Sequence, residues 1–401
     1  MRIGVPREIQ AGETRVALTP HLVPLLTRDG HEVMIESGAG VSARFPDALY
    51  ISVGAMIASD VQALYTQADV IFKVQAPGFN ASLRRHEAEL LADGASLIGL
   101  LAPLAHLDVM RSLARRRITS YSLEYLPRLS RAQSMDALTS MATVAGYKAV
   151  LLAADRLAKM MPLLMTAAGT VAPANVLVLG VGVAGLQAIA TAKRLGARVR
   201  AFDPRPPVRE QVESLGAEFL AMDLPAGVET KGGYALEQSE AFLTRERETI
   251  AANLPSADVV ICSAQVFGKR APLLITSDMA RQMRPGSALV DLAAEQGGNC
   301  EATLPGQEVV RDGVLIIGTT NLPALVPTDA SRLYAGNVVN FFRYLYPRSS
   351  GAQTGPGSGD EIVAGTCITR DGAIVNPAIR AAMAAMHEGV VPLLPAEGVP
   401  S

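Results

Sequence analysis

The chain contains the stretch Val176-Leu177-Val178-Leu179-Gly180-Val181-Gly182-Val183-Ala184-Gly185, in which an apolar run leads into three glycines. Residues 175–179 are predicted to form a buried strand, and residues 183–195 a helix. A G-x-G-x-x-G pattern is weak alone, but between a strand and a helix it is typical of a dinucleotide-binding turn. Gly180 permits the tight turn, Gly182 lets the backbone approach a pyrophosphate, and Gly185 lets helix and strand pack closely. The helix N-terminus would supply amide donors to the phosphates.

An acidic residue follows this turn at the expected distance. Asp203 comes after a predicted strand over residues 198–202. A carboxylate there accepts hydrogen bonds from ribose hydroxyls and repels a 2′-phosphate, so NAD is predicted rather than NADP. The nearby Arg205 weakens that selectivity, because arginine can accommodate a phosphate. The alternative is a glycine-rich turn in an α/β domain that binds no nucleotide, and strand, turn, helix and acid together favour the nucleotide site.

Short apolar runs and helical stretches alternate along most of the chain. Further predicted strands cover residues 1–5, 31–35, 70–74, 97–101, 118–120, 258–262, 288–291 and 314–318. This rhythm predicts an α/β protein with two Rossmann-like, doubly wound parallel-sheet domains and a cofactor cleft between them. We expect one domain to comprise residues 1–138 plus 326–401, and the NAD(H)-binding domain to comprise residues 139–325. A long helix is predicted over residues 138–164, followed by a loop over residues 166–173.

The composition argues against several classes of protein. The formal net charge of -2 gives no support for nucleic-acid binding, which requires a strongly basic surface. The widely spaced Cys262, Cys300 and Cys367 fit neither a disulfide framework nor a zinc site, and no histidine shows metal-ligand spacing. Residues 1–8 do not resemble a signal peptide. Residues 160–192 lack charges but contain prolines and glycines that break a spanning helix, so we expect no membrane segment.

A second polar motif precedes the predicted long helix. It reads Pro127-Arg128-Leu129-Ser130-Arg131-Ala132-Gln133-Ser134-Met135-Asp136. Gln133 and Asp136 are three residues apart, so in a helical turn they share a face. One interpretation is a polar loop at the nicotinamide of a bound cofactor, and the other is a solvated linker that caps the helix. The residues alone leave both interpretations open.

Other polar residues have weaker claims to a function. Arg15 and Lys73 could bind an anionic substrate, although a structural role is more common for such charges. The segment around Gly233 and Tyr234 lies in a long polar stretch and is either a flap over a cofactor or an ordinary insertion. Among the histidines, only His106 comes into consideration as a general base, and we favour a non-catalytic role for it.

Long, specific stretches resemble a known family. These are Ser130-Arg131-Ala132-Gln133-Ser134-Met135-Asp136, Met165-Thr166-Ala167-Ala168-Gly169-Thr170, and residues 180–195, 210–216 and 365–375. Almost the whole chain resembles the alanine dehydrogenase and pyridine nucleotide transhydrogenase superfamily. Within it, the chain is most similar to the NAD(H)-binding first part of the alpha subunits of proton-translocating NAD(P) transhydrogenases.

The resemblance implies that the chain passes a hydride between NADH and NADP(H) bound on a partner subunit, coupled to proton translocation by separate membrane subunits. It implies a homodimer, an NADP-binding beta subunit and membrane-spanning subunits as partners. We therefore expect a cytoplasmic protein that is peripheral on the inner face of the plasma membrane through these partners. Because the chain stops at Ser401, it resembles the form whose membrane segments lie on other chains. Hydride transfer between two nicotinamides needs no general base.

The resemblance also assigns residues to the site. It implies catalytic roles for Arg128, Gln133 and Asp136. The NAD(H)-binding residues that it implies are Arg128, Leu129, Ser130, Arg131, Gln133, Asp136, Thr139, Gly180, Gly182, Val183, Ala184, Asp203, Pro204, Arg205, Gly233, Tyr234 and Gln265. Thr139 stands where serine is usual and keeps the hydroxyl, whereas Gln265 departs from a more apolar stretch. No metal ligand is implied.

Two other functions stay open at this point. One is a stand-alone alanine dehydrogenase, although that family's catalytic histidine has no counterpart in residues 100–105. The other is a nonenzymatic, NAD-binding regulatory subunit. The first predicts that the chain alone forms NADH from alanine, and the second predicts binding without hydride transfer.

Overall fold

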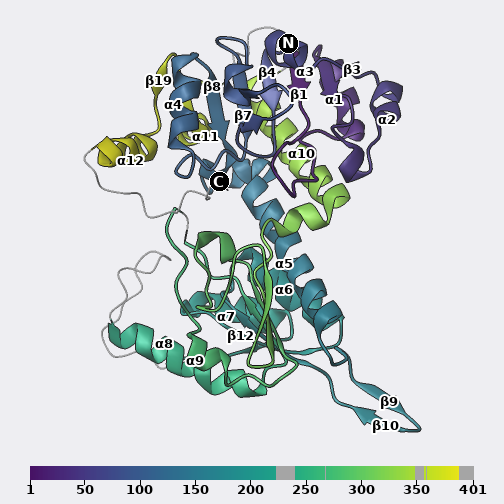
Figure 1. Ribbon diagram of the computed structural model, residues 1–401, viewed down its shortest axis with the longest axis vertical. Helices are drawn as coiled ribbons and strands as arrows, with labels where there is room; N and C mark the ends of the chain where they lie inside the picture. Colours follow the sequence, from purple (N-terminus) through teal and green to yellow (C-terminus); the bar gives the residue numbers. More distant parts are fainter. Residues whose placement is uncertain (223–239, 267, 348–355, 358, 388–401) are drawn as a thin grey trace. The chain divides into compact units, whose positions relative to one another are not determined.

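The computed structural model describes residues 1–222, 240–266, 268–347, 356–357 and 359–387. The chain divides into two compact units, shown in Figure 1. Unit 1 comprises Met1–Met141 and Pro323–Ser401, and unit 2 comprises Ala142–Leu322. Each unit is built around one large sheet.

The sheet of unit 1 has the strand order β19-β18-β8-β7-β4-β1-β2-β3. The strands are β1 (Arg2–Val5), β2 (Glu32–Glu36), β3 (Met56–Ala58), β4 (Val70–Phe72), β7 (Ser96–Gly99), β8 (Thr119–Ser122), β18 (Cys367–Arg370) and β19 (Ala373–Ile374). In the spatial order β3-β2-β1-β4-β7-β8, each strand pairs in parallel with its neighbours, whereas β18 is antiparallel to β8. A small separate hairpin is formed by β5 (Phe79–Asn80) and β6 (Arg85–His86).

The helices of unit 1 come from both of its sequence segments. They are α1 (Val23–Arg28), α2 (Asp47–Ser52), α3 (Val61–Gln67), α4 (Leu107–Arg115), α10 (Pro327–Leu345), α11 (Glu361–Thr366) and α12 (Pro377–His387). The long helix α10 buries Tyr334, Phe341 and Phe342 completely. Because apolar burial is the main driving force of folding, this helix makes the segment after residue 323 an integral part of unit 1.

The sheet of unit 2 has the order β13-β12-β11-β14-β15-β17-β16, and only β16 is antiparallel to its neighbour among these strands. The strands are β11 (Asn175–Leu179), β12 (Arg198–Phe202), β13 (Glu218–Phe219), β14 (Val259–Cys262), β15 (Ala288–Asp291), β16 (Glu308–Arg311) and β17 (Val314–Ile317). The helices are α6 (Val183–Arg194), α7 (Arg209–Ser214), α8 (Glu240–Asn253) and α9 (Ser277–Ala280).

The predicted fold class is confirmed by these sheets. Numbered in chain order, the parallel strands of unit 1 follow the order 3-2-1-4-5-6, and unit 2 begins with the same order 3-2-1-4-5, which is the order of dinucleotide-binding sheets. The antiparallel strands β16, β18 and β19 extend one side of each sheet and are not among the predicted strands. The cleft expected between the two domains stays a prediction.

The predicted long helix over residues 138–164 is too long. Helix α5 covers Ala137–Arg156, and the segment expected to be a loop contributes to an antiparallel hairpin of β9 (Leu164–Thr166) and β10 (Gly169–Val171). The hairpin extends away from the rest of unit 2 in Figure 1. Its side chains are largely exposed on both faces, so it lacks the alternation of buried and exposed residues from which a strand is predicted.

Helix α5 is long and apolar. Among the described residues, it is the one helix whose length and composition would permit a membrane span, and 39% of its most apolar window is buried. Ala149, Val150 and Ala153 of α5 belong to the apolar core of unit 2. Through these residues, α5 forms part of the apolar core of unit 2.

Candidate functional site

The turn after β11 can be built only from glycine at two positions. Gly180 has a φ of +88°, and a Cβ atom on it would lie 2.8 Å from the amide nitrogen of Ala264. A Cβ atom on Gly185 would lie 2.0 Å from the carbonyl oxygen of Gly180. The roles that the sequence assigns to these two glycines, a tight turn and close helix packing, therefore have a direct steric basis.

The end of β14 holds this turn in place. The Ser263 hydroxyl donates to the carbonyl oxygen of Gly180 at 2.8 Å. The Asn299 side chain in turn accepts from the amide of Ala264 at 3.1 Å and donates to its carbonyl oxygen at 2.9 Å. Neither Ser263 nor Asn299 is predicted from the sequence, because each lies more than 75 residues from the turn and carries no motif of its own.

The turn lies where α/β sheets bind ligands. In such sheets, ligands bind outside the carboxyl ends of the strands at the point where the strand order reverses. In unit 2 that point lies between β11 and β14, because β12 and β13 extend to one side and β15 to the other. The turn at Gly180 begins directly at the carboxyl end of β11.

The N-terminus of α6 is open toward a ligand. Gly182 is its N-cap residue, no side chain caps the helix, and a Cβ atom on Gly182 would meet nothing within 4 Å. Val183 is 39% exposed. The first amides of a helix lack partners within the helix, and together with its dipole they favour an anion. The space over Gly182 and the donors beside it fit the pyrophosphate of a dinucleotide.

Helix α5 approaches the same turn from another side. A Cβ atom on Gly146 would lie 2.1 Å from the carbonyl oxygen of Ala184, so α5 packs against the first turn of α6 with almost no space between the two backbones. An isolated glycine inside a helical pattern signals such close packing. Gly146 thereby supports the predicted contact residue Ala184.

Asp203 lies at the turn, as the sequence predicts, and is 5% exposed. One carboxylate oxygen accepts from the amide of Val181 at 2.7 Å. The Arg205 side chain donates to both oxygens, at 2.8 Å from Nε and 2.9 Å from Nη2, and the Arg205 amide donates at 2.9 Å. A carboxylate has about four acceptor positions, so these four donors occupy all of them.

The pairing of Asp203 with Arg205 changes the expected ribose contact. A ribose hydroxyl can reach the carboxylate only if it replaces one of the present donors, and the Arg205 side chain, at 40% exposed, is the one that can leave toward solvent. The bidentate pair also neutralises the local charge of Asp203. Discrimination against a 2′-phosphate therefore cannot rest on Asp203 alone.

The second polar motif forms a short 3-10 helix, η5 (Ser130–Met135), in unit 1. Ala132 and Met135 are buried, whereas the polar side chains between them, including Gln133, are exposed. Asn337 and Asn340 of α10 both donate to the carbonyl oxygen of Ser134, at 3.0 and 3.1 Å. The motif is thus a polar surface segment whose backbone is held by two asparagines of α10.

Neighbouring contacts fix the ends of this motif. Asp136 precedes α5 and accepts from the amide of Thr139 at 2.8 Å and from its hydroxyl at 2.7 Å. This is the helix-capping role that one of the two interpretations expects. Arg131 donates to Asp360 at 3.2 Å. Arg128 is exposed, and the nicotinamide contacts predicted for Arg128, Gln133 and Asp136 stay predictions.

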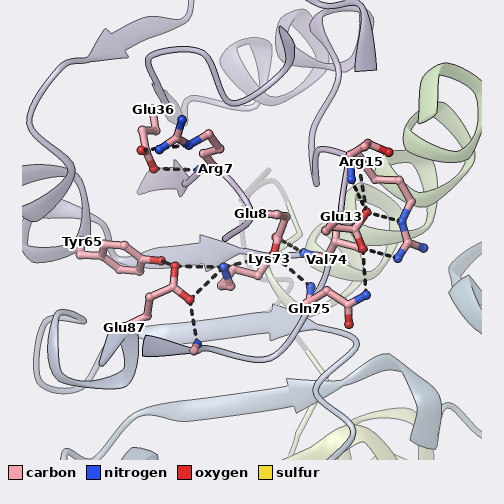
Figure 2. A network of polar contacts seen from close by, with 12 residues as sticks. Arg7, Glu8, Glu13, Arg15, Glu36, Tyr65, Lys73, Val74, Gln75 and Glu87 are labelled. Atoms are coloured by element: carbon pink, nitrogen blue, oxygen red, sulfur yellow. Dashed lines mark hydrogen bonds and ion pairs between the residues drawn. The ribbon is translucent and has the colours of Figure 1, made fainter. Parts of the chain in front are cut away.

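In unit 1, charged side chains occupy the point where the strand order reverses. There, the carboxyl ends of β1 and β4 bring Glu8 and Lys73 together, as Figure 2 shows. The Lys73 ammonium lies 3.2 Å from Glu8 and 3.1 Å from Glu87, and all three side chains are at most 3% exposed. The Tyr65 hydroxyl donates to Glu87 at 2.7 Å. Of the two switch points, the one in unit 2 carries the glycine turn.

Arg15, the other cation considered for an anionic substrate, is also paired. Its guanidinium donates to both oxygens of Glu13, at 2.8 and 2.6 Å, and Gln75 donates to Glu13 at 2.8 Å (Figure 2). Although burial opposes it, the Arg15 guanidinium holds the pKa of Glu13 at about 2. These pairs favour the structural interpretation of Arg15 and Lys73.

For Gln265, Gly233 and Tyr234, the described part of the chain shows no arrangement that supports the predicted cofactor contacts. The side chain of Gln265 is exposed, and its amide donates to the backbone carbonyl oxygen of Leu292 at 2.7 Å. Gly233 and Tyr234 lie outside the described residues. Their predicted cofactor contacts stay predictions.

Comparisons with known proteins cover nearly the whole chain. Residues 4–145 match the N-terminal domain, and residues 149–377 the C-terminal domain, of the alanine dehydrogenase/PNT family. The first part of the NAD(P) transhydrogenase alpha subunit of Rhodospirillum rubrum is 48% identical over 94% of this chain and 99% of its own length. The solved transhydrogenase from Sinorhizobium meliloti has 37% identity and a TM-score of 0.81, covering 94% of this chain and all of its own. The alanine dehydrogenase of Halomonas elongata is 31% identical over 85% of this chain and 86% of its own.

Proposed function

Because the chain belongs to the alanine dehydrogenase/PNT family, and within it to the alpha subunits of NAD(P) transhydrogenases, we propose that it binds NAD(H) and passes a hydride between it and NADP(H) on a partner subunit. The observation that carries the proposal is the glycine turn at Gly180, set at the switch point of unit 2 with Asp203 bonded to it. A transhydrogenase alpha subunit needs such a dinucleotide site, and the partner supplies the second nucleotide.

The proposed cofactor contacts in unit 2 follow from this geometry. The open N-terminus of α6 at Gly182 and Val183 receives the pyrophosphate. Asp203, with Pro204 and Arg205 beside it, receives the adenosine ribose after the Arg205 side chain moves. In unit 1, we propose that the polar segment of η5, including Gln133, orients the nicotinamide.

The chemistry of the proposed reaction agrees with this set of residues. NADH supplies the hydride, and its transfer to a second nicotinamide releases no substrate proton, so no side chain has to act as a base. The protein has to bring the two rings together, orient them and exclude water. Amides, paired charges and a polar surface segment are sufficient for those tasks.

We also propose that two copies of the chain form a dimer through the β9–β10 hairpin. An isolated two-stranded hairpin is marginally stable in water. Met165 is 75% exposed and Leu163 and Val171 are 53% and 41% exposed, although all three are apolar. A second copy of the chain would cover these side chains. Sedimentation equilibrium should give a dimer, and Met165→Asp should shift it toward monomer; a wild-type monomer at micromolar concentration contradicts this part of the proposal.

The remaining partners are proposed from the names of the relatives. These names describe one subunit of a larger complex. We propose an NADP-binding beta subunit and membrane-spanning subunits that couple hydride transfer to proton translocation. The chain would then lie at the inner face of the plasma membrane, held there by these subunits.

A reconstitution assay tests the proposal. The purified chain is mixed with the NADP-binding subunit of a transhydrogenase, and reduction of an acetylpyridine analogue of NAD by NADPH is followed. We expect turnover only when both proteins are present. Formation of NADH from alanine by the chain alone would instead favour alanine dehydrogenase, and NADH binding without turnover in the mixture would favour a regulatory subunit.

A further inference from the structure

Helix α8 carries an acidic residue on its buried face. Phe242, Glu246 and Ile250 are spaced four residues apart, and Leu254 continues the series just after the helix. Their exposed fractions are 3%, 4%, 0% and 0%. Residues at this spacing share one face of a helix, so Glu246 occupies a position in an apolar stripe. An ionisable side chain is rarely buried in this way without a partner or a function.

The buried stripe packs beside the proposed ribose acid. Ile250 and Leu254 belong to the same apolar cluster as Phe202, which directly precedes Asp203. The Asp203 carboxylate is close enough to act on Glu246 electrostatically. No hydrogen bond of the Glu246 carboxyl is found among the described residues. Arg200 of β12 donates to Asn253 of α8 at 2.6 Å, so the buried face of α8 that carries Glu246 packs along the strand that leads to Asp203.

The charges around Glu246 can be counted from its neighbours. Asp203 and Arg205 carry opposite charges and lie together, so the pair adds little net charge at the ribose position. Within the part of the chain that the structure describes, Arg247, the next residue of α8, is the other charged group that acts on Glu246. Ionisation of Glu246 therefore takes the summed charge of these four groups from one net positive charge to none, so it weakens the attraction of the ribose position for an anion.

We propose that Glu246 is a specificity-determining residue of the nucleotide site, whose negative charge excludes the 2′-phosphate of NADP(H). The inference rests on the proposed function, because it requires NAD(H) to bind with its ribose at Asp203. An NADP(H) 2′-phosphate would lie beside Asp203 and Arg205, where Arg205 alone would attract it. The charge of Glu246 opposes that attraction, whereas NAD(H) has no phosphate at this position.

The exclusion depends on pH. Burial, and then the Asp203 carboxylate, raise the pKa of Glu246 to about 7 against the opposing effect of Arg247. Glu246 is therefore ionised above neutral pH and protonated below it. Selectivity for NAD(H) that comes from Glu246 should be present at alkaline pH and disappear as the pH falls through 7.

The experiment compares wild type with Glu246→Gln, which keeps the shape of the side chain but cannot ionise. Dissociation constants for NADH and NADPH are measured by fluorescence titration at pH 6 and pH 8.5, and their ratio is formed for each protein. The 2′-phosphate itself titrates near pH 6, but this effect is common to both proteins and cancels in the comparison. At pH 8.5 the variant should lose selectivity by roughly tenfold, the order of magnitude expected for one unit charge in a partly buried site. At pH 6 the two ratios should agree.

Two further variants keep the result interpretable. Glu248→Gln removes the same formal charge from an exposed side chain of α8, 59% exposed and paired with Arg245, and should match wild type at both pH values. Glu246→Leu restores an apolar stripe and replaces Glu246→Gln if the latter does not fold. A variant with unchanged selectivity at pH 8.5, or with the same loss at both pH values, overturns the inference. Failure of wild type to bind NADH overturns the proposed function instead.

Discussion

Arg205 donates to both carboxylate oxygens of Asp203, at 2.8 Å from Nε to Oδ1 and 2.9 Å from Nη2 to Oδ2. The same carboxylate accepts from the amide of Val181, so a single acid links the phosphate turn to the ribose position. In the proposed nucleotide site of unit 2, Arg205 therefore occupies the acceptor positions that the ribose would use. We expect cofactor binding to exchange hydrogen bonds at Asp203.

Replacement of Asp203 tests that exchange. Asp203→Asn should weaken NADH binding by about 2 kcal/mol, or roughly thirtyfold, because the ribose loses a charged acceptor. Asp258→Asn is the matched control, since Asp258 also accepts from a backbone amide and a lysine, but precedes β14 at the opposite end of the sheet. Calorimetric titration should show weaker NADH binding for Asp203→Asn and wild-type affinity for Asp258→Asn. Equal affinities for the two variants would contradict the ribose contact.

The three glycines of the turn should separate stability from binding. Gly182→Ala adds a methyl group to open space and should leave the midpoint of thermal unfolding within about 1 °C of wild type. The same methyl group would occupy the place proposed for the pyrophosphate, so NADH affinity should fall at least about tenfold. Gly185→Ala places a methyl group 2.0 Å from the Gly180 carbonyl oxygen and should cost about 1–3 kcal/mol of unfolding free energy. If Gly182→Ala binds NADH normally, the phosphate does not lie over Gly182.

The ion pair of Glu13 with Arg15 should stabilise unit 1 in a defined pH range. The pKa of Glu13 is about 2 in the folded chain and 4.5 ordinarily. A lowered pKa gives stability that is present above pH 4.5 and is lost as the pH falls toward 2. Urea unfolding should show wild type more stable than Glu13→Gln by about 2–3 kcal/mol at pH 7, with a smaller difference at pH 3.

A control for this pH series lies nearby. Glu89 is an exposed acid paired with Arg85, and such surface pairs contribute little to stability. Glu89→Gln should therefore show no comparable change between pH 7 and pH 3. A difference between wild type and Glu13→Gln that stays constant over this range would mean that Glu13 is not held ionised by Arg15.

Much of the fold follows from local pattern. The strands at residues 198–202 and 288–291 are predicted to the residue. The second is a fully buried, mostly apolar run, and the first alternates two arginines with Val199 and Ala201. The hairpin of β9 and β10 is missed because both of its faces are exposed. Strands β16 and β18 are also missed. The largely exposed β16 lacks the alternation of buried and exposed residues from which a strand is predicted.

The candidate site likewise contains residues that a local motif predicts and residues that only the folded structure reveals. Gly180, Gly185 and Asp203 are predictable because a local motif requires them. Ser263, Asn299 and Glu246 are not, since their roles arise only when distant strands and α8 pack against the turn. The sequence does raise the possibility that Arg205 binds a phosphate, but its pairing with Asp203 depends on side-chain geometry that spacing cannot predict.

Isotope transfer tests the central claim most directly. NADH carrying deuterium at the transferred position of C4 is mixed with NADP, this chain and the NADP-binding subunit of a transhydrogenase, and the products are analysed by mass spectrometry. Direct transfer between two nicotinamides predicts NADPH that contains the deuterium, with none lost to water and none formed when either protein is omitted. NADPH without deuterium, or no NADPH from the complete mixture while the chain binds NADH, would contradict the claim that this chain donates a hydride to a nucleotide on another subunit.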